Sequence, residues 1–317
     1  MIIVTGGAGF IGSNLIRTLN QNGENNIILV DNLTNGHKMH NIADLNIADY
    51  LDKNEFIERL DNPNFLTYIQ AVFHQGACSA TTEWDGHYVM ANNYEYSKRL
   101  LTWCQTKHVP FIYASSASVY GTGNNGFRIE RHCEKPMNMY AYSKFQFDQY
   151  VHRILPQATS QIVGLRYFNV YGSREQHKGS MSSTVYHFNQ QLHTSDEVKL
   201  FAGCDGYADG EQQRDFVYVN DVVAVNLWFL VNSHRSGIYN VGTGKAETFN
   251  TMARAVMNWH KRGHISYVPF PEHLHGAYQS FTKADISPLR SAGYEREFMT
   301  MEQGVTDYLN QLNQAKT

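Results

Sequence analysis

The stretch Tyr140–Lys144 combines residue types and a spacing that could perform acid–base chemistry. On a helix, residues four apart lie on one face, so the Tyr140 phenol and the Lys144 ammonium can address a common point that Tyr142 cannot reach. A free tyrosine has a pKa near ~10, and a fixed positive charge within a few Å favours the phenolate and lowers that pKa. Tyr140 is therefore a candidate acid and base for a hydroxyl proton, although the same short pattern also occurs on ordinary exposed helix turns.

A glycine-rich turn near the N-terminus offers a possible site for a dinucleotide. Residues 1–5 form an apolar, β-branched run that predicts a buried strand, and Gly-Gly-Ala-Gly-Phe-Ile-Gly follows it directly before a helical pattern. This arrangement suits a pyrophosphate, because glycines permit a tight turn and the helix end offers free N–H groups. The residues of the turn that we expect to contact a cofactor are Gly6, Gly9, Phe10, Ile11 and Gly12.

The end of the second predicted strand, residues 27–30, bears on the choice of dinucleotide. Asp31 follows this strand about twenty residues after the glycines, where an acidic residue commonly holds the ribose hydroxyls of NAD. Asn32 and Lys38 come next in a polar loop, and an ammonium there could neutralise the 2′-phosphate of NADP. The residues alone leave both cofactors open, because Lys38 could equally be a solvated loop lysine.

Small and hydroxylated residues follow two further predicted strands. A strand at residues 71–74 leads into Gly76–Ser79, and a strand at residues 109–116 leads into Ser115–Gly121. Small residues at the carboxyl end of a strand let a cofactor approach the backbone, and serine hydroxyls there can donate to a substrate oxygen. Serines also end strands without any chemical role, so these runs do not assign a function by themselves.

Alternating β and α patterns run through roughly the first 170 residues and predict an α/β fold with a doubly wound parallel (Rossmann) sheet. They include a third strand ending within residues 44–47 and a long helix over residues 83–107. We expect a dinucleotide-binding domain at residues 1–170, with segments of 214–245 available to complete its sheet. Residues 171–317 should form mainly a smaller, mixed α/β substrate-binding lobe, with substrate in a cleft between the two.

Composition excludes several classes of protein. The 317 residues are 42% hydrophobic and 17% charged, with a net charge of -3, so neither nucleic acid nor an acidic membrane surface is an expected partner. Cys78, Cys104, Cys133 and Cys204 are dispersed and read as reduced thiols, and the fifteen histidines lack metal-ligand spacing, so no metal is expected. No signal peptide or apolar span is evident, which predicts a cytoplasmic protein.

Four motifs in a fixed order make the chain similar to the extended short-chain dehydrogenases/reductases, which include nucleotide-sugar epimerases and dehydratases. The motifs are G-x-x-G-x-x-G, Ser115–Gly121, Tyr140-x-x-x-Lys144 and Arg166–Gly172. The resemblance implies that Ser116 pairs with Tyr140 and Lys144. A dehydratase would be expected to carry an acidic residue in the triplet before Val-Tyr-Gly, and Ser116-Ala-Ser has none, so dehydration is disfavoured.

Longer strings at residues 76–86, 174–181 and 214–219 resemble the branch of this family that epimerises ADP-linked heptoses. That resemblance implies inversion of C6″ of the heptose through a transient ketone, with NADP rather than NAD, supplying heptose for lipopolysaccharide. It implies Tyr140, Lys178, Lys144 and Ser116 as catalytic residues, with Lys178 as a second acid/base. It further implies a homo-oligomer, a pentamer. The alternatives are a UDP-hexose 4-epimerase with bound NAD and a non-enzymatic NADP sensor, although a sensor would typically lack the tyrosine or the lysine.

The same resemblance implies which residues contact the cofactor and which contact the nucleotide sugar. Together with the residues above, it places cofactor contacts at Asp31, Asn32, Lys38, Lys53, Gln75, Gly76, Ala77, Cys78, Ser79, Asn92, Tyr140, Lys144, Val170 and Lys178. It places nucleotide-sugar contacts at Ser116, Asn169, Ser180, His187, Phe201, Ala202, Gly203, Cys204, Arg214 and Tyr278. Two departures from the pattern are a glutamine at position 75, where a glutamate is expected, and a longer loop at residues 205–213.

Overall fold

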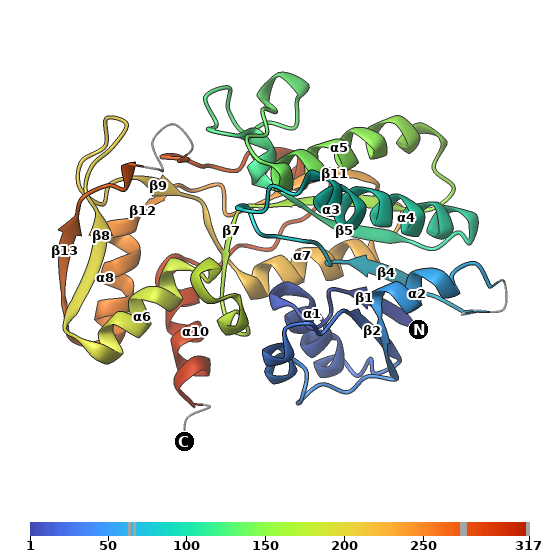
Figure 1. Ribbon diagram of the computed structural model, residues 1–317, viewed down its shortest axis with the longest axis horizontal. Helices are drawn as coiled ribbons and strands as arrows, with labels where there is room; N and C mark the ends of the chain where they lie inside the picture. Colours follow the sequence, from blue (N-terminus) through green and yellow to red (C-terminus); the bar gives the residue numbers. More distant parts are fainter. Residues whose placement is uncertain (63–64, 66–67, 273–277, 315–317) are drawn as a thin grey trace. The chain divides into compact units, whose positions relative to one another are not determined.

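A seven-stranded sheet organises the computed structural model, which describes residues 1–62, 65, 68–272 and 278–314 (Figure 1). In sheet order its strands are β11 (Gly237–Val241), β6 (Ile162–Tyr167), β5 (Phe111–Ser116), β4 (Ala71–His74), β1 (Ile2–Thr5), β2 (Ile27–Asp31) and β3 (Asp49–Asp52). The pairings from β3 through β2, β1 and β4 to β5 are all parallel. The predicted doubly wound parallel sheet is confirmed.

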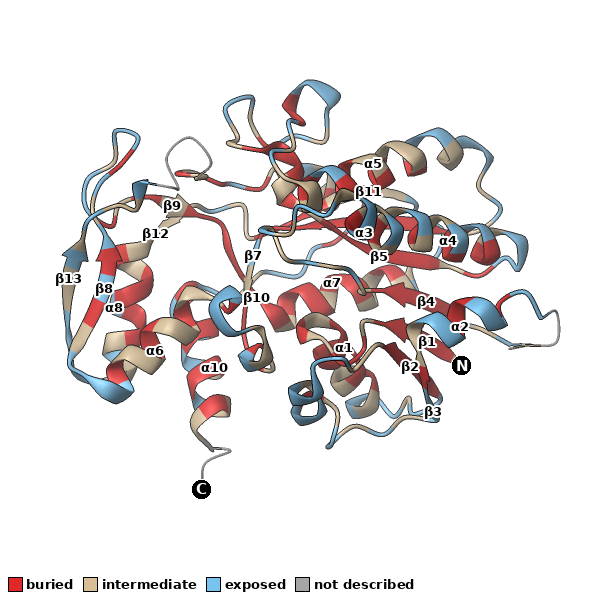
Figure 2. Cartoon of the chain, viewed as in Figure 1, coloured by how far each residue is buried: buried red, intermediate tan, exposed pale blue. Residues whose placement is uncertain are grey.

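The central strands are mainly apolar and end in a polar residue, because helices cover both faces of the sheet. Every residue of β1, β2 and β4 is buried (Figure 2). Right-handed crossovers place the helix between β1 and β2 on one face, and the helices linking β4, β5 and β6 on the other, because the strand order reverses beside β1. The covering helices are α1 (Phe10–Gln21), α2 (Lys53–Arg59), α3 (Gly86–Met90), α4 (Tyr96–Thr106) and α5 (Met139–Ile154).

One local prediction was wrong, and another is confirmed with an interruption. The third strand lies at Asp49–Asp52 rather than at residues 44–47, because the register that pairs Ile28 with Asp49 starts β3 two residues beyond that stretch. The helix expected over residues 83–107 is divided into α3 and α4 by a π-helical turn, η2 (Ala91–Glu95). Such turns widen a helix locally and are frequent at functional sites.

Two compact units divide the chain. The first comprises Met1–Val119, Pro136–Arg166 and Val223–Tyr239, and the second comprises Tyr120–Lys135, Tyr167–Val222 and Asn240–Thr317. Both units are discontinuous in sequence, so neither coincides with a single boundary near residue 170. The assignment of substrate binding to residues 171–317 stays a prediction.

The second unit is built from short paired strands and helices (Figure 1). Its strand pairs are β7 (Asn169–Tyr171) with β10 (Phe216–Tyr218), β8 (Glu197–Phe201) with β13 (His264–Val268), and β9 (Gln213–Arg214) with β12 (Glu247–Thr248). Its helices are α6 (Thr184–Thr194), α8 (Phe249–His260), α9 (Ser287–Ser291) and α10 (Met301–Gln314), and α7 (Val219–Val231) begins in it. The remaining short helical turns of the chain are η1 (Gly36–Asn41), η3 (Ala117–Tyr120), η4 (Arg131–Cys133), η5 (Leu155–Gln157) and η6 (Gln176–Met181).

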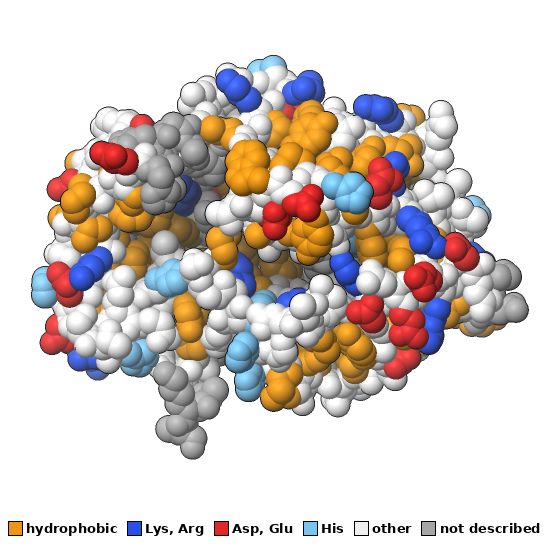
Figure 3. Space-filling view, in the orientation of Figure 1, with side chains coloured by type: hydrophobic (Ala, Val, Ile, Leu, Met, Phe, Trp, Pro, Cys, Tyr) orange, Lys and Arg blue, Asp and Glu red, His pale blue; other side chains and the backbone are white. Residues whose placement is uncertain are grey.

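Surface features limit the kinds of partner. On the face drawn in Figure 3, basic and acidic side chains are interspersed rather than gathered into one patch of a single sign. No helix among the described residues has both the length and the apolar character needed to cross a membrane. In the same part of the chain, no three His, Cys, Asp or Glu side chains gather in a way that could hold a metal ion.

Candidate active site

The glycine turn after β1 lies against the turn after β4, at the point where the strand order reverses. Gly6 has φ of 64°, and a Cβ on it would lie 2.6 Å from the Gly76 Cα. A Cβ on Gly12 would lie 2.2 Å from the Gly6 carbonyl oxygen. Only glycine fits these two positions, and the resulting crevice at the carboxyl ends of β1 and β4 is where doubly wound folds bind dinucleotides.

The N-terminus of α1 lies directly after the glycine turn. Gly9 occupies the N-cap and makes no side-chain cap hydrogen bond, and no acidic residue lies in the first turn. Phe10, Ile11 and Gly12 begin this twelve-residue helix. This positive helix end fits the pyrophosphate of a dinucleotide.

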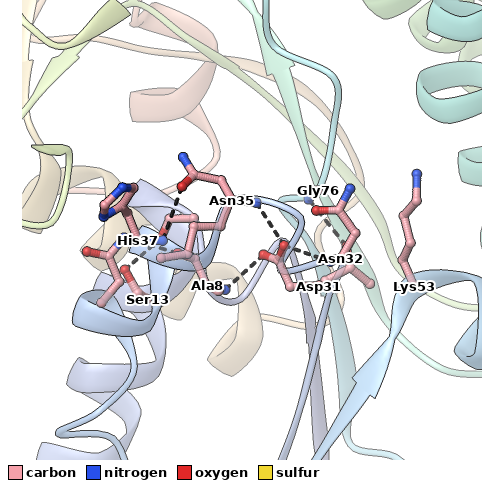
Figure 4. Close-up of polar contacts among 12 residues, drawn as sticks. Ala8, Ser13, Asp31, Asn32, Asn35, His37, Lys53 and Gly76 are labelled. Atoms are coloured by element: carbon pink, nitrogen blue, oxygen red, sulfur yellow. Dashed lines mark hydrogen bonds and ion pairs between the residues drawn. The ribbon is translucent and has the colours of Figure 1, made fainter. Parts of the chain in front are cut away.

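Asp31, at the end of β2, stabilises the glycine turn by hydrogen bonding. It is 5% exposed, and its Oδ2 accepts a hydrogen bond from the Ala8 N–H at 3.0 Å (Figure 4). Its Oδ1 accepts from the Asn32 N–H at 2.8 Å and pairs with the Lys38 Nζ at 2.9 Å. Lys38 thus offsets the negative charge of Asp31, which would otherwise repel a phosphate group near this strand end.

Lys53 and Asn92 form the next polar pair along the edge of the sheet. Lys53 opens α2 directly after β3, and its ammonium donates to the Asn92 Oδ1. The Asn92 amide donates in turn to the Tyr88 carbonyl at 2.7 Å, which fixes its orientation. In Figure 4 the side chains of Asn32 and Lys53 extend in the same direction from the ends of neighbouring strands.

The segment after β4 is held by backbone and side-chain contacts. Its first N–H groups, those of Gln75 and Gly76, donate to the Thr5 carbonyl and hydroxyl at 3.0 and 3.3 Å. The Gln75 side chain donates to the Asn226 Oδ1 at 3.1 Å, so the neutral amide found here in place of a carboxylate makes a contact of its own. Ala77 and Ser79 are exposed and Cys78 is partly buried.

Asn93 is a site residue that the sequence analysis missed. Its carboxamide is 1% exposed and grips Cys78 at both backbone groups, accepting from the N–H at 2.7 Å and donating to the carbonyl at 2.9 Å. It also donates to the Ser143 hydroxyl at 3.0 Å, and Ser143 donates to the Tyr140 carbonyl at 2.7 Å. Asn93 therefore links the segment after β4 to the helical turn that carries Tyr140.

Ser116, Tyr140 and Lys144 come together at the end of β5 and the start of α5. The Asn138 side chain caps α5 by accepting from the Ala141 N–H at 2.8 Å, which fixes the first turn of the helix. The Tyr140 phenol is hydrogen-bonded to Ser116. The spacing predicted from the sequence thus places the candidate acid/base beside the serine hydroxyl.

Burial dominates the electrostatics of this group. Desolvation raises the pKa of Tyr140, the hydrogen bond with Ser116 partly lowers it, and Cys78 adds a smaller rise. Desolvation also lowers the pKa of Lys144 to about 8, against the opposing charge of Asp148, and the Lys144 ammonium donates to the Ala114 carbonyl at 2.7 Å. The net shift of the Tyr140 pKa is upward, opposite to the lowering predicted from Lys144, and removal from water is its largest cause.

A buried ion pair anchors α5 behind Lys144. Asp148 and Arg166 are both fully buried and meet at 2.8 Å, and the hydroxyls of Tyr113 and Ser115 donate to the same carboxylate at 2.8 Å each. A buried carboxylate needs this many donors to remain ionised. The network joins α5 to β5 and β6, and so it fixes the position of α5, and of Lys144 one turn before Asp148, relative to these strands.

The second unit gathers a separate set of predicted residues around Arg214. This side chain is 6% exposed, and its guanidinium carbon lies 4.7 Å from the centre of the Tyr278 ring and 5.6 Å from that of Phe249. Gln212 donates to the Ala202 carbonyl at 2.9 Å and to the Cys204 sulfur at 3.4 Å, while the Gly203 N–H donates to Asp209 at 2.7 Å. The long loop at 205–213 thus folds back onto residues 202–204, beside half-exposed Phe201.

Other predicted residues of the second unit lie on β7, η6 and α6. Asn169 and Val170 belong to β7, where the Asn169 side-chain oxygen accepts from Thr282 at 3.3 Å. Lys178 and Ser180 lie in η6, and a ring nitrogen of His187 lies 3.3 Å from the Ser180 carbonyl. Desolvation lowers the pKa of Lys178, against the opposing charge of Glu175.

Comparison with known proteins gives one consistent family. A model described as the NAD dependent epimerase/dehydratase family matches residues 2–242. The ADP-L-glycero-D-manno-heptose-6-epimerase of Alkalilimnicola ehrlichii is 59% identical over 310 residues, which are 98% of this chain and 97% of that protein.

Two solved structures resemble the whole chain. The crystal structure of the Helicobacter pylori ADP-L-glycero-D-manno-heptose-6-epimerase has a TM-score of 0.84 at 31% identity, covering 98% of this chain and 96% of that one. The UDP-glucose 4-epimerase of Thermus thermophilus, solved in complex with NAD, has a TM-score of 0.79 at 26% identity, covering 99% of each chain.

Proposed function

Because this chain belongs to the NAD-dependent epimerase/dehydratase family, we propose that it inverts C6″ of ADP-D-glycero-D-manno-heptose to give the L-glycero epimer, for use in lipopolysaccharide. The observation that carries the proposal is the 59% identity over 98% of the chain to a heptose 6-epimerase. The hydrogen-bonded Ser116 and Tyr140 at the end of β5 supply a chemical centre suited to a carbinol proton.

A nicotinamide dinucleotide suits the residues of the first unit. Gly6 and Gly12 leave no room for a Cβ, a Cβ on Gly76 would lie 3.1 Å from the Gly6 nitrogen, and the first turn of α1 follows this glycine turn. When bound, the nicotinamide supplies a hydride acceptor and then a hydride donor for the carbinol carbon. The residues of the first unit that would hold it are the glycine turn, Asn32, Lys38, Lys53, Asn92, the segment 75–79 and Lys144.

The charges around Asp31 favour NADP over NAD in this proposal. Three donors from the protein already contact the Asp31 oxygens, which leaves about one of the roughly four acceptor sites of a carboxylate for a ribose hydroxyl. The Lys38 ammonium is 20% exposed at its side chain and can still reach a 2′-phosphate. Titration with NADP and NAD, followed by analysis of the nucleotide that copurifies, tests this preference.

Two proton carriers explain how one site could produce both epimers. Tyr140 would exchange the hydroxyl proton of one epimer, helped by a hydrogen bond from Ser116 to the reacting oxygen, and Lys178 would exchange the proton of the other. Between the two steps the C6″ ketone turns about its exocyclic bond and presents its opposite face. Asn169, Ser180, His187, Arg214, Tyr278 and residues 201–204 would hold the nucleotide sugar.

The central experiment incubates the purified protein with ADP-D-glycero-D-manno-heptose and resolves the two epimers. Tyr140→Phe and Lys178→Met should each lose epimerisation by about a thousandfold, within the range for removing a general acid–base. Tyr142→Phe is a matched control, because Tyr142 lies on the same helix but is 42% exposed, and it should stay active. Full activity in Lys178→Met would exclude the two-carrier scheme.

The same preparation separates the alternative function, a UDP-hexose 4-epimerase. Conversion of UDP-glucose together with copurified NAD, and no action on the ADP-heptose, would favour that alternative. We also propose that the protein is a cytoplasmic homo-oligomer, a pentamer by resemblance, which light scattering of the purified chain would test.

A further inference from the structure

The segment that carries Lys178 is closed at its base by one buried acidic residue, Glu175. The Glu175 side chain is fully buried, and its two oxygens accept from the Ser183 N–H and the Ser183 hydroxyl, each at 2.6 Å. A third donor, the Gly172 N–H, lies 3.4 Å away. The Glu175 carboxylate therefore contacts both Gly172, before segment 175–183, and Ser183, the last residue of that segment.

The backbone of Glu175 completes the closure. Its carbonyl accepts from the Lys178 N–H at 2.9 Å and from the Ser182 hydroxyl at 3.1 Å. Ser183 also caps α6 by accepting from the Tyr186 N–H at 3.3 Å. Hydrogen bonds thus join the two ends of segment 175–183, and Ser183 connects the segment to the N-terminus of α6. These contacts restrict the position of the Lys178 backbone.

Burial raises the pKa of Glu175, and the hydrogen bonds from Ser183 and the charge of Lys178 act against that rise. The groups that contact its oxygens are the Ser183 N–H, the Ser183 hydroxyl and the Gly172 N–H, and hydrogen-bond donors of this kind favour the ionised carboxylate. The charged and titratable groups that face it are Lys178 of its own segment and the Tyr308 phenol of α10. Tyr186 of α6 and Tyr218 of β10 in turn act electrostatically on Tyr308, and both raise its pKa.

We propose that Glu175 is a positioning residue for Lys178, because its buried carboxylate closes segment 175–183 and its backbone carbonyl accepts from the Lys178 N–H. The inference rests on the proposed role of Lys178 as a proton carrier. Burial lowers the pKa of Lys178 and Glu175 opposes that change, so the carboxylate keeps the amine able to hold a proton as well as to release it.

The test measures the titration of Lys178 directly. Trace acetylation of the full-length protein across a pH series, read by mass spectrometry of the Lys178 peptide, gives the pH midpoint of that amine. Glu175→Gln should move the midpoint downward by about one pH unit or more, as expected for loss of an opposite charge close by. The exposed Lys245 is the internal reference, and Glu295→Gln, at an exposed position in the same unit, should leave the Lys178 midpoint unchanged.

A second variant covers the case in which Glu175→Gln does not fold. Glu175→Asp keeps the charge but withdraws it by one methylene, so it should lower the midpoint by a smaller amount. An unchanged midpoint in folded Glu175→Gln, or in Glu175→Asp when it is the one that folds, overturns the proposal. Because acetylation is read without turnover, this result is distinct from failure of the proposed function, which Lys178→Met tests.

Discussion

The buried His74 should make the protein acid-sensitive by an amount that the structure sets. His74 is 2% exposed, with its Nδ1 2.6 Å from the Thr5 hydroxyl and its Nε2 2.8 Å from the Ser97 hydroxyl. Its ring stacks on those of Tyr96 and Phe111. Burial, with a smaller contribution from the positive charge of Lys144, lowers the pKa of His74 from 6.5 to about 3.

The sign follows from where each state binds the proton. The unfolded chain protonates His74 near 6.5, and the folded chain does so only near 3, so the stabilisation is complete above 6.5 and is lost as pH falls towards 3. The full difference corresponds to about 5 kcal/mol, of which about 2 kcal/mol is lost between pH 7 and pH 5. Lys144, whose pKa is lowered to about 8, stays protonated across that interval and does not contribute.

Urea unfolding at pH 7 and pH 5 measures this loss in wild type and in His74→Gln. The difference in unfolding free energy between the two pH values should be about 2 kcal/mol larger in wild type, because His74→Gln removes the titrating group. Buried carboxylates such as Asp215 and Glu175 titrate in both proteins and cancel. His234→Gln, at an exposed position in the same unit, is the control. Equal pH dependence in wild type and His74→Gln would refute the reasoning.

Three further changes test the two units. Gly12→Ala would place a Cβ against the Gly6 carbonyl oxygen. The amount of dinucleotide that copurifies with the protein, measured by absorbance after denaturation, should therefore fall by about tenfold or more. Lys38→Met should weaken NADP binding by about tenfold or more, roughly 1.4 kcal/mol by calorimetry, and NAD binding much less; equal losses would contradict the proposed phosphate contact. Asp215→Asn removes a carboxylate that accepts from three backbone N–H groups and the Thr243 hydroxyl, so unfolding free energy should fall by about 2–4 kcal/mol, and an unchanged urea midpoint would contradict this.

The first unit was readable from sequence because its signals are local. The glycine turn follows a strand at once, and Tyr140 and Lys144 lie within one helical turn, so no long-range contact was needed to place them. Asp31 was found at its strand end, but its contacts with Ala8 and Lys38 depend on three-dimensional neighbours. The sequence therefore predicted the position of the Asp31 carboxylate, but it did not show that donors of the protein itself bind its oxygens.

Asn93 could not be assigned because its role depends on a change of helical pitch. In a regular helix over residues 83–107, neighbouring asparagines such as Asn92 and Asn93 point about 100° apart, and no pattern says which one faces Cys78. The π-helical turn rearranges this stretch, so that Asn92 meets Lys53 and Asn93 meets Cys78 and Ser143. Two adjacent residues with weak helix propensity were the one available signal.

The parallel pair β8 and β13 illustrates the other limit. Glu197–Phe201 pairs with His264–Val268 more than sixty residues later. The first strand mixes buried positions with charged residues, and the second has only intermediate and exposed positions. Short strands of this kind are defined by their partner rather than by their own composition. Phe201 is the last residue of β8, directly before residues 202–204. The positions of these predicted substrate contacts therefore depend on the pairing of β8 with β13, which the local sequence does not indicate.

Burial acts in opposite directions on the two proposed proton carriers, and that difference matches the proton balance of an epimerisation. It raises the pKa of Tyr140, which favours the protonated phenol, and lowers the pKa of Lys178, which favours the neutral amine. A reaction that removes a proton from one hydroxyl and returns a proton to its epimer needs one group of each kind at the start. Turnover exchanges their protonation states, and the exchanged state is the one that the reverse reaction requires. Environments that push two pKa values apart therefore suit a reversible epimerase better than two identical bases would.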